Sequence, residues 1–174
     1  MEDIEVPTEH LHETILEKAE DAAKHLKEKG WSMSVAVSTA LMAVFAAIAG
    51  LMAGHHSNEA LIEQIKASDQ WAYYQAKGIK AEIKALSVNG IKTDDAAVAK
   101  YKKEQEDIKK EAESAQKISE FHLEKHVRLA SAVTLFQMAI AISAIAILTK
   151  KKFLWIGGIG IALVGLVFFT AGII

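Results

Sequence analysis

Histidine and glutamate side chains at helical spacing are the groups of this chain that could do chemistry. Four of the seven histidines fall into two short groups, His55 with His56 and His122 with His126. Residues four apart share one face of a helix, as His122 and His126 do, and as His55 and Glu59 do. Imidazole and carboxylate groups at this spacing can bind zinc or another transition metal. The sequence therefore offers a metal site of five side chains if the fold brings both groups together.

Two other interpretations of these histidines remain open. They can be ordinary amphipathic residues at a membrane boundary, bonded to water, lipid or each other. They can also form a pH-sensitive contact, because imidazole titrates near neutral pH. The remaining histidines, His10, His12 and His25, belong to an acidic N-terminal segment, residues 1–30, which we expect to form an amphipathic helix. Its apolar residues are Leu11, Ile15, Ala19, Ala22 and Leu26.

Three long uncharged segments must position these groups. No charged residue occurs in the segments 31–54, 129–149 and 153–174. The first would be roughly 36 Å long as a helix, enough to cross a hydrocarbon layer of ~30 Å. We therefore predict an all-α integral membrane protein with transmembrane helices over 31–54, 128–149 and 153–174, the last two joined by a tight basic turn at 150–152.

The lysines predict the orientation of these spans. Lys24, Lys27 and Lys29 precede the first span, and the basic turn lies on the same side, which favours a cytoplasmic N-terminus. The segment 55–127 and the end of the third span would then face outward. Trp31 and Trp155 fall on the lysine side, where interfacial tryptophans are common.

The segment 55–127 reads as one long antiparallel coiled-coil hairpin outside the membrane. Asn89 and Gly90 mark its turn, and Thr93 is a candidate N-cap of the returning helix. If the turn centres near Ile91, opposed residues have numbers that sum to about 183, and His56 would face Val127. Alternating steps of three and four predict a seam of Ile62, Ile65, Asp69, Ala72, Ala76, Ile79, Ile83 and Leu86 against Val98, Tyr101, Gln105, Ile108, Ala112, Ala115, Ser119 and His122.

Exposed aromatic and small residues suggest contacts between copies of the chain or, for the aromatic residues, with the ends of the same chain. Trp71 and Tyr74 face away from the predicted seam, and exposed aromatic residues are common at contact surfaces. Small residues recur in the spans at intervals that suit close helix packing, within or between subunits. The candidate contacts are Trp71, Tyr74, Gly50, Gly54, Gly158 and Ala162.

Composition argues against several functional classes. The chain has no cysteine and a net charge of −2, which excludes thiol chemistry and gives no case for a nucleic-acid partner. The spans contain no ionisable residue, which disfavours proton-coupled transport. No phosphate-binding loop or catalytic triad is present, so we expect neither an enzyme nor a small-molecule substrate.

The run Trp71-Ala72-Tyr73-Tyr74-Gln75-Ala76-Lys77, with the preceding Gly54-His55-His56-Ser57-Asn58-Glu59, resembles the signature of a bacterial membrane-protein family described as a domain of unknown function. The likeness extends over nearly the whole chain. It implies a bacterial inner-membrane protein of this layout, without an assigned reaction or cofactor.

The leading hypothesis is a non-enzymatic, homo-oligomeric scaffold in the membrane that acts through its hairpin. One alternative is a metal-binding sensor or enzyme that uses the His/Glu cluster. Another is an oligomeric pore, with Gln137 and Thr134 of the second span lining the path.

Overall fold

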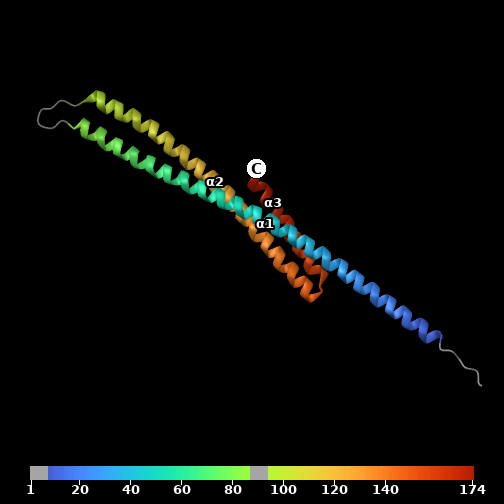
Figure 1. Ribbon diagram of the computed structural model, residues 1–174. Coiled ribbons are helices and arrows are strands. Elements are labelled where there is room, and N and C mark those ends of the chain that lie inside the picture. The colour runs from blue at the N-terminus through green and yellow to red at the C-terminus, as the bar shows by residue number, and fades with distance from the viewer. Residues whose placement is uncertain (1–7, 87–93) are drawn as a thin grey trace, which may run out of the picture.

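The computed structural model describes the backbone of residues 8–86 and 94–174, and the side chains in these ranges from Lys29 onward together with Lys18 and Asp21. The described chain is all-helical, with α1 (Thr8–Ala85), α2 (Asp95–Thr149) and α3 (Lys152–Ile173) (Figure 1). Each of the three is long and apolar enough to cross a membrane. The prediction of an all-α chain with three such helices is confirmed.

Helix α1 is a single helix of 78 residues. The expected N-terminal helix, the first span and the first arm of the hairpin therefore follow one another without a break; residues 1–7 lie outside the described part. The chain has one proline, Pro7, which precedes Thr8, so no proline interrupts α1. In Figure 1 α1 extends past the other two helices at its N-terminal end.

Both ends of α2 are fixed by local hydrogen bonds. At the start, Asp94 Oδ1 accepts the backbone N–H of Ala97 at 3.1 Å; the candidate cap Thr93 and the turn residues Asn89 and Gly90 lie outside the described residues. At the end, Lys150 adopts a left-handed conformation with φ of 55°. The N–H groups of Lys150 and Lys151 then bond to carbonyl groups of the last turn, so the chain reverses directly into α3.

The arms of the hairpin are antiparallel, but their register differs from the prediction. Ser119 Oγ donates to the Ala60 carbonyl at 2.7 Å, and Gln105 Nε2 donates to the Tyr74 carbonyl at 3.1 Å. Both pairs have numbers that sum to 179 instead of 183. The predicted pairing of His56 with Val127 is wrong by about one helical turn, because α1 ends at Ala85 and α2 begins at Asp95, which centres the connection before Ile91.

The face of α1 that packs on α2 is a column of small residues, not the predicted isoleucine seam. Ala53, Ala60, Ala67 and Ala81 are buried at intervals of seven or fourteen residues. Alanine lets the two backbones approach closely, and on α2 the predicted Ile108, Ala112, Ala115 and Ser119 are indeed buried against it. The prediction for the first arm is wrong: the exposed positions are Ile62, Ile65, Asp69, Ala72, Ala76, Ile79, Ile83 and Leu86.

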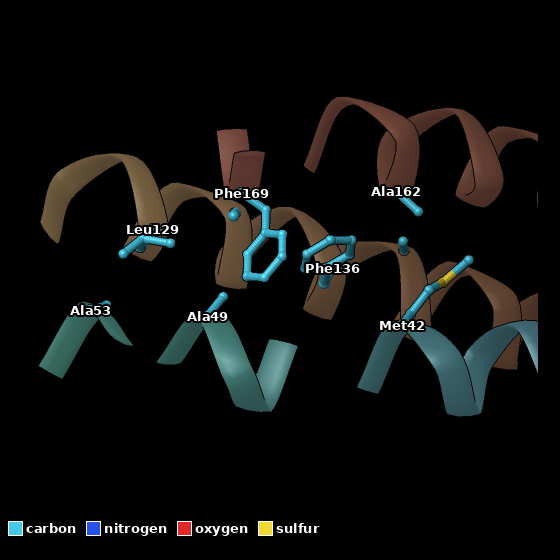
Figure 2. Packing of buried hydrophobic residues seen from close by; sticks show 9 residues of the cluster. Met42, Ala49, Ala53, Leu129, Phe136, Ala162 and Phe169 are labelled. Carbon is cyan, nitrogen blue, oxygen red and sulfur yellow. The ribbon is translucent and has the colours of Figure 1, made fainter. Parts of the chain in front are cut away.

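The hydrophobic core lies where all three helices meet (Figure 2). α2 is central, because it packs on both α1 and α3, whereas α1 and α3 make few contacts with each other. Phe136 of α2 is almost fully buried, and its ring stacks on Phe45 with centroids 6.0 Å apart. The buried cluster consists of Met42, Ala49, Ala53, Leu129, Ala132, Phe136, Ala139, Ala162 and Phe169.

Candidate functional site

Two of the predicted histidines meet where the hairpin joins the apolar core. His56 Nδ1 of α1 lies 2.9 Å from His122 Nδ1 of α2. One ring must donate and the other accept, so the contact requires at least one imidazole to be neutral. One turn further along α2, His126 Nδ1 donates to the Ala53 carbonyl at 2.8 Å. These contacts tie the two arms together at the point that we call the hairpin base.

The electrostatics of the hairpin base favour the neutral form of His56. Burial lowers the pKa of His56 below its ordinary value, and the neighbouring His122 and His55 lower it further. Glu59 acts in the opposite direction but has the smallest effect. His56 therefore enters the contact with His122 as a neutral ring at pH 7.

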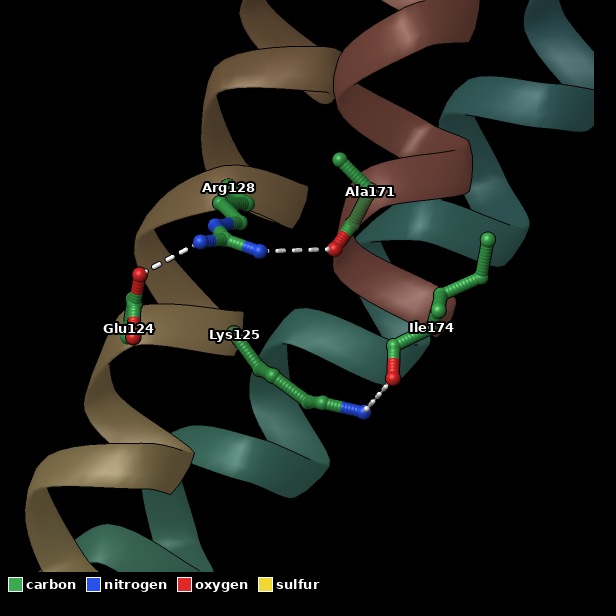
Figure 3. A network of polar contacts seen from close by, with 5 residues as sticks. All are labelled: Glu124, Lys125, Arg128, Ala171 and Ile174. Carbon is green, nitrogen blue, oxygen red and sulfur yellow. Dashed lines mark hydrogen bonds and ion pairs between the residues drawn. The ribbon is translucent and has the colours of Figure 1, made fainter.

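Cations of the hairpin base also cap the end of α3 (Figure 3). Arg128 Nη1 donates to the Ala171 carbonyl at 3.1 Å, and Lys125 Nζ donates to the carbonyl oxygens of Ile173 and Ile174. Glu124 holds the Arg128 guanidinium from the other side. Positive charge is favourable at a helix C-terminus, where the last carbonyl groups lack partners inside the helix. The last turn of α3 is thereby fixed to α2 at Lys125 and Arg128, within two turns of His122 along that helix.

Only part of the predicted metal site comes together. Among the described residues, no group of three or more His, Asp or Glu side chains is arranged to hold a metal. His56 and His122 bond to each other, His126 is used by the Ala53 carbonyl, and the ring of the exposed His55 packs on His56 with centroids 5.4 Å apart. Glu59 acts on His56 through its charge. Metal binding by His55, His56, Glu59, His122 and His126 stays a prediction that would require these contacts to rearrange.

A family model matches residues 31–174, which include the whole hairpin and all three candidate membrane segments. The chain belongs to the family named Domain of unknown function (DUF4337). No curated protein and no solved structure matches the chain. The DUF4337 region begins at Trp31, at the start of the first apolar segment, so the preceding turns of α1 lie outside the match.

About two-thirds of the way from the base of the DUF4337 hairpin to its tip, a charged pair links the two arms. Lys77 of α1 forms an ion pair with Glu104 of α2, and its ammonium group lies 5.1 Å and 5.3 Å from the ring centroids of Tyr73 and Tyr101. The hydrogen bond raises the pKa of Lys77 and lowers that of Glu104. Both groups therefore stay charged at neutral pH and hold the arms in register.

The aromatic pair of the signature lies beside α2 and not on the outward face. Trp71 and Tyr74 pack edge to face with centroids 5.5 Å apart, and both are only partly exposed. Tyr74 continues the alanine column, and its carbonyl accepts Gln105. Because the observed register turns this side of α1 towards α2, the aromatic pair packs within the hairpin. Its contact with another copy stays a prediction.

The predicted small-residue contacts divide into two groups. Gly158 and Ala162 are buried against α2 within the chain, since a Cβ on Gly158 would lie 3.1 Å from Ser143 Oγ and 3.2 Å from the Ala139 carbonyl. Both residues thus pack within the chain, and a contact with another copy stays a prediction. Gly50 and Gly54 are exposed on α1. Their contact with a neighbour stays a prediction.

The two residues proposed to line a pore, Gln137 and Thr134, lie exposed on α2. The Thr134 hydroxyl is used within the helix, where it donates to the Ala130 carbonyl at 3.0 Å. The pore stays a prediction about an assembly of several copies.

Sequence reasoning missed Lys77, Gln105, Lys125 and Arg128 as positioning residues. Only for Gln105 did the sequence contain a usable signal of this role, because a polar residue in an apolar seam needs a hydrogen-bond partner. The roles of Lys125 and Arg128 had no local signal, since the carbonyl groups that they cap lie more than forty residues away.

Proposed function

We propose that the protein is a non-enzymatic membrane scaffold that crosses the bilayer three times and assembles from copies of itself along one face of α1. The crossing segments are residues 31–54, 128–149 and 153–174, of which all but the boundary residue Arg128 are uncharged. The hairpin, with all thirteen acidic residues that follow position 30, stands in water. The basic turn and Lys29 favour a cytoplasmic location for the N-terminal side, and the family resemblance favours a bacterial inner membrane.

One observation carries this proposal: α1 has an exposed apolar stripe that runs from the first span along the whole hairpin. We call it the outer stripe. All its positions are exposed, and all but His55, Asn58 and Asp69 are apolar. They follow alternating steps of three and four: Val37, Leu41, Val44, Ile48, Leu51, His55, Asn58, Ile62, Ile65, Asp69, Ala72, Ala76, Ile79, Ile83 and Leu86.

Lipid can cover the first third of the outer stripe, but not the part on the hairpin. Ile62, Ile65, Ile79, Ile83 and Leu86 are each more than half exposed. Monomeric soluble surfaces rarely expose a contiguous apolar row of this kind. Burying the exposed part of each of these side chains would contribute about 1–2 kcal/mol, so an apolar partner in water is favoured.

A second copy of the chain is the occupant that fits both parts of the outer stripe. A partner must offer an apolar row in lipid that continues, in the same register, into water. Copies in one bilayer share their orientation, so two α1 helices related by a twofold axis along the membrane normal lie parallel and in register. The spacing of three and four is that of a parallel coiled coil, and Ala72 and Ala76 allow close approach.

A cysteine cross-linking experiment tests the assembly, because the chain has no cysteine of its own. In membranes, Ile79→Cys and Ile48→Cys should each give a disulfide-linked dimer on oxidation, since equivalent stripe positions face each other across the axis. The matched control is Ser114→Cys on the exposed face of α2, which should remain monomeric. A dimer at Ser114 as strong as at Ile79, or no dimer at either stripe position, would overturn the assembly.

Membrane crossing is tested separately by alkaline carbonate extraction of membranes. The protein should stay in the pellet and enter solution only with detergent. Recovery in the carbonate supernatant would reject the membrane part of the proposal.

A further inference from the structure

The end of the core opposite the hairpin base has an excess of positive charge. Lys29 of α1 and Lys151 and Lys152 at the α2–α3 turn are all exposed. Among the described side chains, neither Lys151 nor Lys152 has a carboxylate partner; Glu28, next to Lys29 in the sequence, lies outside the described side chains. This end is therefore suited to an anion.

Two tryptophans lie at the same level as these lysines. Lys152 Nζ is 6.0 Å from the centroid of the Trp31 ring, and Trp31 Nε1 is enclosed without a hydrogen-bond partner among the described residues. A buried N–H donor without a partner is costly, so an acceptor is expected there. Trp155 Nε1 by contrast donates to Ser38 Oγ at 3.1 Å, which ties α3 to α1 at this end.

The start of α3 adds further donors. Lys151 is the N-cap of α3, and its side chain makes no capping hydrogen bond. The first N–H groups of a helix have no partner inside the helix, and the helix dipole favours an anion at that point.

An apolar groove of about 200 Å³ lies between α1 and α3; its lining on α1 begins at Ser38, about two turns after Trp31. The groove exists because α1 and α3 both pack on α2 and hardly on each other. Ser38, whose hydroxyl accepts Trp155 Nε1–H, is the one polar side chain in its lining. The rest of the lining consists of Leu41, Met42, Phe45, Phe136, Ile159, Ala162, Leu163 and Leu166.

We propose that this end of the molecule binds one anionic phospholipid, with the phosphodiester at Lys151, Lys152 and Trp31 Nε1–H and an acyl chain in the α1/α3 groove. The combination decides the class of ligand, because a soluble anion would leave the groove empty and a neutral lipid would leave the lysines without a counter-charge. Basic pockets between transmembrane helices recognise anionic headgroups in this way. The proposal rests on the membrane crossing proposed above.

Native mass spectrometry of the full-length protein in nonionic detergent tests the site. Phosphatidylglycerol should bind with a stoichiometry of one per chain, and phosphatidylcholine with the same acyl chains should bind at least tenfold more weakly. Lys151→Gln/Lys152→Gln should weaken phosphatidylglycerol binding by about tenfold or more, since each lysine near an anionic headgroup adds to the attraction. Trp31→Phe, which keeps an aromatic ring and removes the donor, should weaken it severalfold.

Three controls separate a phospholipid site from attraction by overall charge, a site for a free anion, and a contact between copies. Lys109→Gln/Lys110→Gln on the hairpin makes the same change in charge and should leave binding unchanged; equal weakening would mean attraction by overall charge and overturn the proposal. Glycerol 3-phosphate, a headgroup without chains, should not displace the lipid; displacement at equal concentration would make the site one for a free anion.

Leu163→Trp fills the groove and should weaken lipid binding, while the Ile79→Cys dimer still forms. If the dimer is lost and lipid binding is unchanged, the groove is a contact between copies.

Failure here is separable from failure of the proposed membrane crossing. A protein that stays in the carbonate pellet but binds both lipids equally would refute the phospholipid site alone.

Discussion

The contact between His56 and His122 at the hairpin base requires at least one of the two rings to be uncharged. The Nδ1–Nδ1 contact of His56 and His122 cannot survive protonation of both rings, because each nitrogen would then be a donor. The hydrogen bond between the two rings therefore links the arms, and its strength varies with pH over the range in which imidazole titrates.

This predicts a pH-dependent stability with a defined sign. The pKa of His56 is lowered in the fold, so the unfolded chain binds more protons, and stability is highest above the unfolded value of 6.5. The free energy of unfolding should fall as the pH drops below 6.5 and through the lowered pKa of His56. The loss should be about 1 kcal/mol when the hydrogen bond breaks. Thermal unfolding in detergent at pH 8 and pH 5.5 measures this. In His122→Phe the difference should shrink, whereas His55→Gln, which leaves the pair intact, should retain most of it.

The ion pair between Lys77 and Glu104 should fix how the arms align. Lys77→Glu places two acids opposite each other and should destabilise the hairpin modestly, as expected for a partly exposed pair. The exchange Lys77→Glu/Glu104→Lys should recover part of this loss in thermal unfolding. Lys66→Glu is the control, because Lys66 pairs with Glu63 on its own arm. An equal loss in the control would mean that general charge, not the bridge, is responsible.

At the scale of the elements, α3 approaches α2 through glycines spaced by seven residues. Gly158, Gly165 and Gly172 are all buried, and an added Cβ on Gly172 would lie 2.7 Å from Leu129 Cγ and 2.9 Å from its Cδ2. Leu129 is fully buried and cannot move aside. The glycines therefore determine how closely the two helices pack.

We expect Gly172→Ala to destabilise the three-helix core by about 1–3 kcal/mol, the usual cost of overpacking. Gly157→Ala is the control, because a Cβ there meets nothing within 4 Å; it should be neutral or stabilising by up to about 1 kcal/mol, since alanine favours helix. Unfolding by heat or SDS in mixed micelles compares the two. Equal destabilisation by both would contradict close packing at Gly172.

The three helices also show which features of the fold could be predicted from the sequence alone. Three apolar segments without charge predict three helices because length and hydropathy are local properties. The inner face of α1 was not predictable in the same way, because both the alanine column and the outer stripe satisfy a helical repeat. The choice between them depends on how closely α2 approaches, which a single helix does not encode. The predicted histidine site depends on the same register. With the arms shifted by about one turn, His56 and His122 bond to each other, and metal binding by the cluster stays a prediction.

For the whole molecule, the unbroken course of α1 has a mechanical consequence. The helix continues for about 35 Å before the first apolar segment and about 47 Å beyond it, at 1.5 Å per residue. No proline or loop between these parts can absorb bending. If α1 pivots where it crosses the bilayer, a lateral force on the tip of the hairpin moves the N-terminal end of the helix in the opposite direction. A force applied on one side of the membrane is then transmitted to the other side without any change of fold.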